Sequence, residues 1–185
     1  MTPDSSLSTQ RTILRPWREQ DAEVLFRWAS NPAVGPIAGW SAHRTIEESR
    51  QIIRTVFSAP ECYAVVLRST GEPIGAVAIK SGNNLTPSLQ GTPDAELGYW
   101  LAEPYWGQGL MTEVVRCIVE RAFRVLGYQR LWCGYYEGNQ RSRRVMEKCG
   151  FGFHHTEYNK PTMLGEERTE HFLLLERRQY CKPEE

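Results

Sequence analysis

The sequence predicts one α/β domain, with a mixed, mostly antiparallel sheet of about seven strands flanked by about four helices. Three observations support this fold class. The chain has 185 residues, the usual size of a single domain. Runs rich in β-formers alternate with amphipathic runs along its second half, as in α/β proteins. Neither an internal repeat nor a linker divides it, so we expect the domain to cover residues 9–178, between a loose polar leader (1–8) and a tail (179–185).

The first half of the chain predicts a strand, two helices and a hairpin. Residues 9–17 alternate polar and apolar side chains, the pattern of a strand. Asp21 is the expected N-cap of a helix that ends before Asn31-Pro32, since the residue before a proline avoids the helical region. A second helix starts at a capping box with Thr45 as the cap and Glu48 reaching back. Two β-rich runs then form a hairpin, followed by a long surface loop: residues 62–68, 73–80 and 81–93.

The second half predicts four further strands and two further helices. A strand of buried character at residues 95–101 leads through a loop with two glycines into a helix at 112–126. Asn139 is the expected N-cap of the last helix, which ends at Gly150. The remaining strands are expected at residues 130–136, 152–158 and 171–176.

The composition argues against several classes of function. Twenty-two Lys and Arg residues balance 22 Asp and Glu residues, so no global field attracts nucleic acid or an anionic membrane. No segment has the roughly 20 apolar residues of a membrane span, and the N-terminus lacks the pattern of a signal peptide. We therefore expect a cytoplasmic protein without nucleic-acid or membrane partners.

The cysteines and histidines do not predict a metal site. The cysteines are odd in number and spread out, and Cys149 near His154 and His155 is a poor match to zinc-ligand spacing. We expect no bound metal. The two histidines and His171 fall on the expected closing strands, where a satisfied or exposed histidine is the ordinary case. All five cysteines are expected to be reduced and structural: Cys62, Cys117, Cys133, Cys149 and Cys181.

The most informative stretch contains Gly107 and Gly109, directly before the helix expected at 112–126. Glycines let consecutive backbone amides turn inward, and a helix N-terminus adds unpaired donors and a partial positive charge. Together they predict an anion site that needs no lysine. Two glycines can also form a simple turn. A Walker A loop is excluded because no lysine follows, and a dinucleotide fingerprint is excluded because its third glycine is replaced by Thr112.

Residues 105–113, Tyr-Trp-Gly-Gln-Gly-Leu-Met-Thr-Glu, resemble the pyrophosphate loop of the GNAT acetyltransferases, and more narrowly that of the RimJ/RimL branch. Trp106 stands where most GNAT proteins have Arg or Gln, as is usual in this branch. Met111 stands where most have Gly or Ala. Three further blocks resemble the branch: residues 11–17 followed by Asp21-Ala22, Ser30 to Val34, and Asn139 to Phe151.

This resemblance implies a GNAT fold and a co-substrate, acetyl-CoA. The implied reaction transfers acetyl directly to a primary amine, and the resemblance to this branch implies that the amine is the α-amine of a protein N-terminus. Two alternatives stay open: acetylation of a small amine such as a polyamine, an aminoglycoside or an amino-acid-like toxin, and acyl-CoA binding without turnover. The acceptor pocket is expected from three loops without readable motifs, at residues 32–44, 82–93 and 158–168, with Trp40 as one lining residue. A monomer and a homodimer are both compatible.

The resemblance also implies roles for individual residues. Glu96 is the implied proton acceptor, although a surface strand carboxylate is an alternative. Ser142 is the implied donor to the leaving thiolate, although serine is also common at helix starts. A basic cluster at 141–144 could contact the 3′-phosphate or form a solvated helix face. The residues implied to bind CoA are Tyr99, Trp100, Leu101, Trp106, Gly107, Gln108, Gly109, Leu110, Met111, Thr112 and Asn139.

Overall fold

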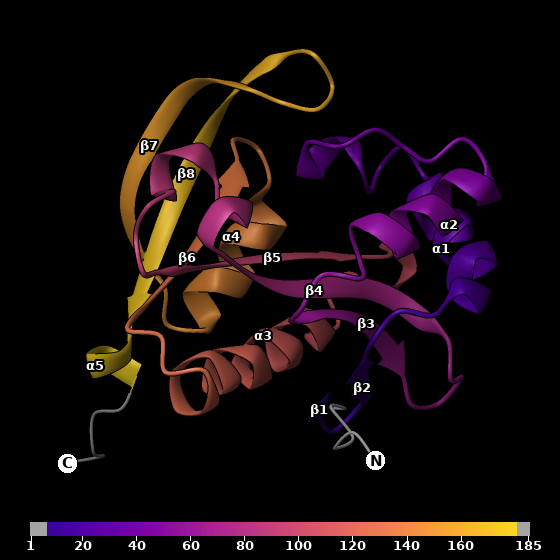
Figure 1. Cartoon of the computed structure of the whole chain (residues 1–185), viewed down its shortest axis with the longest axis horizontal. Helices are drawn as coiled ribbons and strands as arrows, with labels where there is room; N and C mark the ends of the chain where they lie inside the picture. The colour runs from indigo at the N-terminus through magenta and orange to yellow at the C-terminus, as the bar shows by residue number, and fades with distance from the viewer. Residues whose placement is uncertain (1–6, 181–185) are drawn as a thin grey trace.

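The computed structural model describes residues 7–180, which form one eight-stranded sheet with helices on both faces (Figure 1). The strand order is β1-β2-β3-β4-β5-β6-β8-β7. All neighbouring strands are antiparallel except β5 and β6, so the sheet is mixed and mostly antiparallel, as predicted. The strands are β1 (Leu7–Ser8), β2 (Thr12–Arg15), β3 (Cys62–Leu67), β4 (Pro73–Ser81), β5 (Ala95–Leu101), β6 (Arg130–Tyr136), β7 (Gly152–Pro161) and β8 (Glu167–Glu176).

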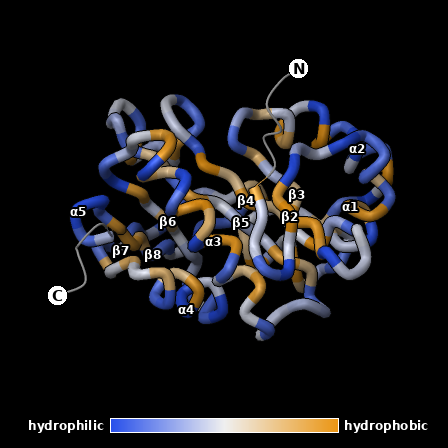
Figure 2. Tube along the Cα trace, turned by 90° about the horizontal axis from the view of Figure 1, so that it is seen from below, coloured by the Kyte–Doolittle hydropathy of each residue, from blue (hydrophilic) through white to orange (hydrophobic). Residues whose placement is uncertain are grey.

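Helices cover the sheet on two sides. The helices are α1 (Ala22–Ala29), α2 (Ile46–Thr55), α3 (Leu110–Glu120), α4 (Gln140–Lys148) and the short α5 (Arg177–Tyr180). Side chains of β3 alternate between two cores: Tyr63 and Val65 pack with α3, whereas Ala64 and Val66 pack with α1 and α2. Apolar stretches therefore gather on the central strands, while the hydrophilic ones lie on outer loops (Figure 2).

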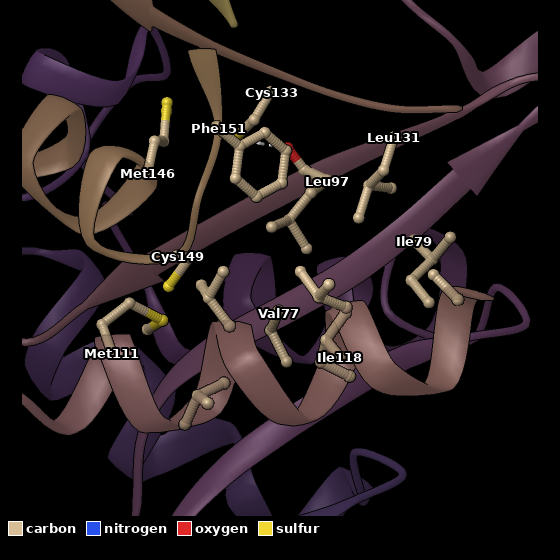
Figure 3. Packing of buried hydrophobic residues seen from close by; sticks show 14 of the residues in the cluster. Val77, Ile79, Leu97, Met111, Ile118, Leu131, Cys133, Met146, Cys149 and Phe151 are labelled. Carbon is tan, nitrogen blue, oxygen red and sulfur yellow. Dashed lines mark hydrogen bonds between the residues drawn. The ribbon is translucent and has the colours of Figure 1, made fainter. Parts of the chain in front are cut away.

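The larger core lies between α3 and strands β4 to β6 (Figure 3). Ile118 of α3 is fully buried in the same cluster as Val77 of β4, Leu97 of β5 and Leu131 of β6. Burial of side chains of this size contributes roughly 1.5–3 kcal/mol each. This packing fixes the start of α3 against the sheet, and the functional loop described below immediately precedes it.

Several boundaries differ from those predicted. Helix α3 begins at Leu110 rather than residue 112 and continues as a wider π-helical turn over residues 121–125. Strands β7 and β8 are longer than expected. Residues 7–8, assigned to the leader, form β1, and residues 179–180 of the assigned tail belong to α5. Residues 1–6 of the leader and 181–185 of the tail, with Cys181, lie outside the described residues.

All three predicted N-cap residues stand at the starts of their helices, and two of them make the capping hydrogen bond. The hydroxyl of Thr45 accepts a hydrogen bond from the amide of Glu48 (3.0 Å) at the start of α2, and Asn139 caps α4. Asp21 is the N-cap residue of α1 as predicted, but its carboxylate makes no hydrogen bond to the first turn of that helix. It instead accepts from the amide of Arg18 and from the guanidinium of Arg15. Within the described residues, no helix is long and apolar enough to cross a membrane.

Strands β5 and β6 separate along their length. They pair only at Ala95, Glu96 and Leu97 of β5, opposite residues 131–133 of β6. Beyond this point β5 stays paired with β4, and β6 stays paired with β8. One edge of β5 from Gly98 onward therefore has backbone groups without a partner strand, and the split opens in the middle of the sheet.

Candidate active site

Two cavities meet at the split between β5 and β6. The first, of about 350 Å³, lies beside the glycine loop and the starts of α3 and α4; we call it the loop cavity. The second, of about 730 Å³, lies over the floor formed by β4, β5, β6 and β8; we call it the sheet cavity. Tyr99, Trp100, Asn139 and Ser142 line both cavities, so a ligand in one would reach a ligand in the other at these residues.

The glycine loop turns at Gly107 and Gly109, whose φ angles are +73° and +78°. Side chains rarely adopt this region, so glycine is required here for the backbone path. Gly109 directly precedes α3, and Glu113 is the first residue whose amide donates to a carbonyl of this turn, that of Gly109 (3.2 Å). The backbone amides of the first turn of α3 have no preceding helical carbonyl to which they could donate. Since this turn lines the loop cavity, it offers donors and a partial positive charge to an anion.

Arg11 of the segment before β2 holds the loop from outside. Its guanidinium donates to the carbonyl of Gln108 (2.9 Å) and to the carboxylate of Glu113 (3.0 Å). The Gln108 side chain donates to the carbonyl of Pro104 and is not among the residues that line the loop cavity. Of the predicted loop residues, those on the cavity wall are Trp106, Gly107, Gly109, Leu110, Met111 and Thr112.

Met111 does not obstruct this site with its side chain. Its side chain is one of the core residues drawn near the start of α3 and is 5% exposed (Figure 3). It belongs to the same cluster as Cys149 and Phe151. The methionine that departs from the usual Gly or Ala therefore packs into the core while its backbone remains on the cavity wall.

Only some of the cationic side chains of α4 face the loop cavity. Arg141, Arg144 and Lys148 line it, and the guanidinium of Arg141 lies 4.4 Å from the ring centre of Trp106. Arg143 points elsewhere and pairs with Glu147 (2.8 Å). The basic cluster at 141–144 thus divides between a cavity face and a solvated helix face.

Ser142 lies where the two cavities join. Its hydroxyl is 2.9 Å from the phenol oxygen of Tyr99, and its amide donates to the side chain of Asn139 (3.2 Å). The three residues come from β5 and the start of α4, on either side of the split. Burial raises the pKa of the Tyr99 phenol well above its ordinary value, so this group is protonated at neutral pH.

Glu96 lies on the floor of the sheet cavity, 4% exposed, and is held by three donors. Lys80 donates to Oε1 (2.9 Å), and Thr86 donates from its hydroxyl to Oε1 (3.1 Å) and from its amide to Oε2 (2.7 Å). Both carboxylate oxygens are therefore engaged. Glu96 lies beside the split and is buried, so it is not the surface carboxylate of the alternative interpretation, and its partners come from β4 and the loop that follows it.

Sequence reasoning missed a second carboxylate on this floor, that of Glu170 on β8. Its Oε2 pairs with Lys160 of β7 (2.9 Å), and both residues line the sheet cavity. Burial raises the pKa of Glu170. The predicted strand started at residue 171, whereas β8 starts at Glu167. Continuing the alternation back from the buried Phe172 would have placed Glu170 on the inward face.

All three expected loops contribute walls to the sheet cavity. They provide Ile37, Ala38 and Trp40; Asn84, Thr86 and Pro87; and Lys160 and Pro161. The end of α2 contributes a fourth wall that was not anticipated. Trp40 packs edge-to-face on Trp100 with ring centres 6.0 Å apart, so one aromatic pair lies at the junction side of this cavity.

The histidines of the closing strands and the cysteines are assigned no part in this chemistry, although Cys62 and Cys133 line the sheet cavity. None of the histidines at 154, 155 and 171 lines either cavity, and each has a hydrogen-bonding partner. Burial raises the pKa of the thiols of Cys62 and Cys149 to about 11 and holds the pKa of the Cys133 thiol well above its ordinary value. Over residues 7–180, no group of three or more His, Cys, Asp and Glu residues is arranged to hold a metal ion.

Comparison with known sequences identifies one family. Residues 11–152 match the family described as the acetyltransferase (GNAT) domain, a range that includes the split strands and the glycine loop. The chain is also similar to the uncharacterized N-acetyltransferase YoaA of Bacillus subtilis (strain 168). The two are 29% identical over 150 residues, which cover 78% of this chain and 81% of YoaA.

Solved structures share the fold. A Vibrio cholerae protein described as a "putative ribosomal-protein-serine acetyltransferase" has a TM-score of 0.76 and 25% identity, covering 95% of this chain and 99% of that one. RimJ of Mycobacterium smegmatis, solved with CoA-disulfide, also has a TM-score of 0.76, at 19% identity. That match covers 97% of this chain and 91% of RimJ.

Proposed function

The chain belongs to the GNAT family of acetyl-CoA-dependent N-acetyltransferases, and we propose that its acceptor is the α-amino group of a protein N-terminus. The observation that carries this proposal is the meeting of the loop cavity and the sheet cavity at the split between β5 and β6. An anion-binding loop lies on one side of the junction, and carboxylates lie on the other. A donor in the first cavity and an amine in the second would meet beside Tyr99 and Ser142.

The loop cavity fits the chemistry of acetyl-CoA. We assign the pyrophosphate to the backbone amides of residues 107–112, at the start of α3. The unpaired edge of β5 over residues 99–101 suits the amides of pantetheine, as when a peptide adds to a sheet edge. Arg141, Arg144 and Lys148 supply cations for phosphate oxygens. Asn139 lies at the junction and is assigned a contact to the same co-substrate.

Proton transfers are the work of the chain's own residues. When bound, acetyl-CoA supplies a thioester whose carbonyl carbon accepts the amine lone pair, while the carbon–sulfur bond breaks with its electrons on sulfur. A carboxylate of the sheet cavity, Glu96 or Glu170, takes the proton of the ammonium form and returns it to water. The hydroxyl of Ser142 donates a proton to sulfur and regains one from the acylated nitrogen. The products are the N-acetyl amine and a thiol, without a covalent enzyme intermediate.

The acceptor class is inferred from charge and acidity. The charged residues that line the sheet cavity cancel: Glu96 and Glu170 against Lys80 and Lys160. A polycation such as a polyamine or an aminoglycoside gains little from such a wall. An α-amine, with a pKa of about 7.7–8, is roughly a quarter neutral near pH 7.4, whereas a lysine side chain is about a thousandth neutral. The name of the Vibrio cholerae relative, which refers to a ribosomal protein, points in the same direction.

Two other functions lead to different measurements. Acetylation of a small amine uses the same cavities with a different occupant. Acyl-CoA binding without turnover uses the loop cavity alone. A small-amine acetyltransferase differs from the proposed enzyme in the acceptor that it acetylates. A protein that only binds acyl-CoA forms no acetylated product with any acceptor.

The test is a panel of acceptors incubated with acetyl-CoA and purified protein, with mass spectrometry as the readout. The panel contains peptides with a free N-terminus, the same peptides with a blocked N-terminus and an internal lysine, polyamines and aminoglycosides. We expect a mass shift of one acetyl group on free N-termini only. Faster turnover of a polyamine or aminoglycoside than of any peptide would refute the acceptor class. Binding of acetyl-CoA without any product would refute catalysis.

A further inference from the structure

The two carboxylates of the sheet cavity differ in how their oxygens are engaged. Both Glu96 and Glu170 are buried side chains that line the cavity. Glu96 accepts three hydrogen bonds, which engage both of its oxygens. Glu170 pairs through Oε2 with Lys160, and among residues 7–180 no side chain or amide donates a hydrogen bond to its Oε1. One oxygen of Glu170 is therefore free to accept a proton from a ligand.

The free oxygen of Glu170 extends over the floor of the cavity. A Cβ atom at Gly134 of β6 would lie 2.5 Å from Oε1 of Glu170, so the carboxylate rests against the bare backbone at this glycine. Gly134 also lines the sheet cavity and follows directly after the last residue of β6 that pairs with β5. The absence of a side chain at this position gives the carboxylate a path from β8 toward the split.

We propose that Glu170, rather than Glu96, is the catalytic residue that takes the proton from the acceptor ammonium. This inference rests on the proposed function of the sheet cavity as the acceptor site. The N–H bond of the ammonium breaks, its proton forms an O–H bond with Oε1 of Glu170, and the electron pair stays on nitrogen for the attack. Glu170 later releases the proton to water, which restores the carboxylate.

The surroundings of Glu170 support this role. Burial raises its pKa and the charge of Glu96 adds to the rise, whereas the ammonium groups of Lys160 and Lys80 oppose it. The phenol of Tyr136, opposite Glu170 in the β6–β8 register, is a further titratable neighbour. A carboxylate with a raised pKa is a stronger base than an ordinary one and more closely matched to an amine near neutral pH. Lys160 also pairs with Glu157 (2.8 Å), so its charge is shared between two carboxylates.

Glu96 then has a positioning role. Its three hydrogen bonds join Lys80 of β4 to Thr86 of the loop that forms one wall of the sheet cavity. Removing its charge should disturb this wall and the binding of the acceptor. The Glu170 carboxylate, whose titration shapes the pH profile of the rate, should remain in that variant. The pH profile therefore distinguishes a positioning role of Glu96 from a role as the proton acceptor.

The first experiment measures kcat and KM from pH 6 to 10 for Glu170→Gln and Glu96→Gln, using the best acceptor of the panel. For an α-amine, Glu170→Gln should lower kcat about tenfold or more at pH 7 and recover above about pH 8, where the amine loses its proton unaided. Glu96→Gln should mainly raise KM. Calorimetric affinity for acetyl-CoA should match the wild type in both variants. A pH-dependent recovery in Glu96→Gln, with wild-type kcat in Glu170→Gln, would overturn the proposal.

A second pair of variants keeps both carboxylates and therefore does not depend on how the glutamine variants fold. Lys160→Met removes the cation beside Glu170, and Lys80→Met removes the one beside Glu96. The acidic limb of kcat/KM should move to higher pH in Lys160→Met and move less in Lys80→Met. A larger shift of the acidic limb in Lys80→Met than in Lys160→Met would assign this limb to Glu96 and overturn the proposal. Failure of the proposed acceptor class is visible separately, because it appears in the wild-type panel and moves the recovery of Glu170→Gln to about pH 10 for a lysine.

Discussion

The phenol oxygen of Tyr99 on β5 lies 2.9 Å from the hydroxyl oxygen of Ser142 on α4, across the split between β5 and β6. The phenol also donates to the carbonyl of Ser142 (3.1 Å). These two bonds, together with the capping bond from Ser142 to Asn139, fix the serine hydroxyl at the junction of the two cavities. A residue of the split strand thus orients the group that we assign to the leaving thiolate.

Ser142→Ala should lower kcat by about 10–100-fold without changing the affinity for acetyl-CoA. The expected loss is at the modest end for an acid catalyst, because the leaving thiol has a pKa near 8.5 and needs limited assistance. Tyr99→Phe should produce a smaller loss, since the hydroxyl remains but loses its orienting partner. Steady-state rates and calorimetry measure the two quantities. Wild-type kcat in both variants would exclude Ser142 as the donor.

Gly109→Val should weaken acetyl-CoA binding tenfold or more, which corresponds to about 1.4 kcal/mol. Its φ of +78° is unfavourable for a β-branched residue, so the change should distort the turn whose backbone amides are assigned to the pyrophosphate. Gly71→Val is the matched control, because Gly71 has a similar φ of +72° with no atom within 4 Å of its Cβ position. Calorimetry should find the control unchanged in affinity. Equal losses in both variants would attribute the effect to backbone strain alone.

Arg144→Ala should lower the affinity for CoA about 5–20-fold, whereas Arg143→Ala should leave it within about twofold. Arg144 lines the loop cavity, while Arg143 is paired with Glu147 on the outer face of the same helix. The two changes remove the same charge one residue apart, so long-range electrostatics cancel in the comparison. Repeating the titration with CoA lacking its 3′-phosphate shows which phosphate Arg144 contacts. An equal loss of CoA affinity in the two variants would contradict the conclusion that Arg144 faces the bound CoA and Arg143 does not.

Local sequence signals predicted the parts of the site that depend on one segment. The bounds of β5 and β6 agree with the predicted strands at 95–101 and 130–136, because both strands are rich in apolar and aromatic residues. The glycine loop and the cap at Asn139 were also found from short patterns. The GNAT resemblance is confirmed by the family match over residues 11–152.

The parts that were missed depend on contacts between distant segments. Three donors from Lys80 and Thr86 hold Glu96, and no spacing in the sequence connects them. Glu170 was missed because the predicted strand was too short by four residues, so its inward orientation was not considered. The start of α3 was placed two residues late, since the positive φ of Gly109 as a helix cap is a property of the folded loop.

The last prediction concerns acid stability and Glu157 of β7. Burial alone would raise the pKa of this carboxyl, but hydrogen bonds from Lys160, Ser88 and His155 lower it from 4.5 to about 2. A depressed pKa stabilises the folded state above the ordinary value, and this contribution is lost as the pH falls through the folded value. Glu157→Gln should therefore be less stable than the wild type by a constant amount above about pH 5, with the difference shrinking toward pH 2.

Urea unfolding at several pH values measures this difference. Glu147→Gln is the control, because the pair of Glu147 with Arg143 is half exposed on a helix surface and is expected to contribute little. Its stability difference from the wild type should stay small throughout. A difference for Glu157→Gln that does not change between pH 5 and 2 would mean that the ionised carboxylate contributes nothing to folding, and that any loss comes from packing of the side chain against β8.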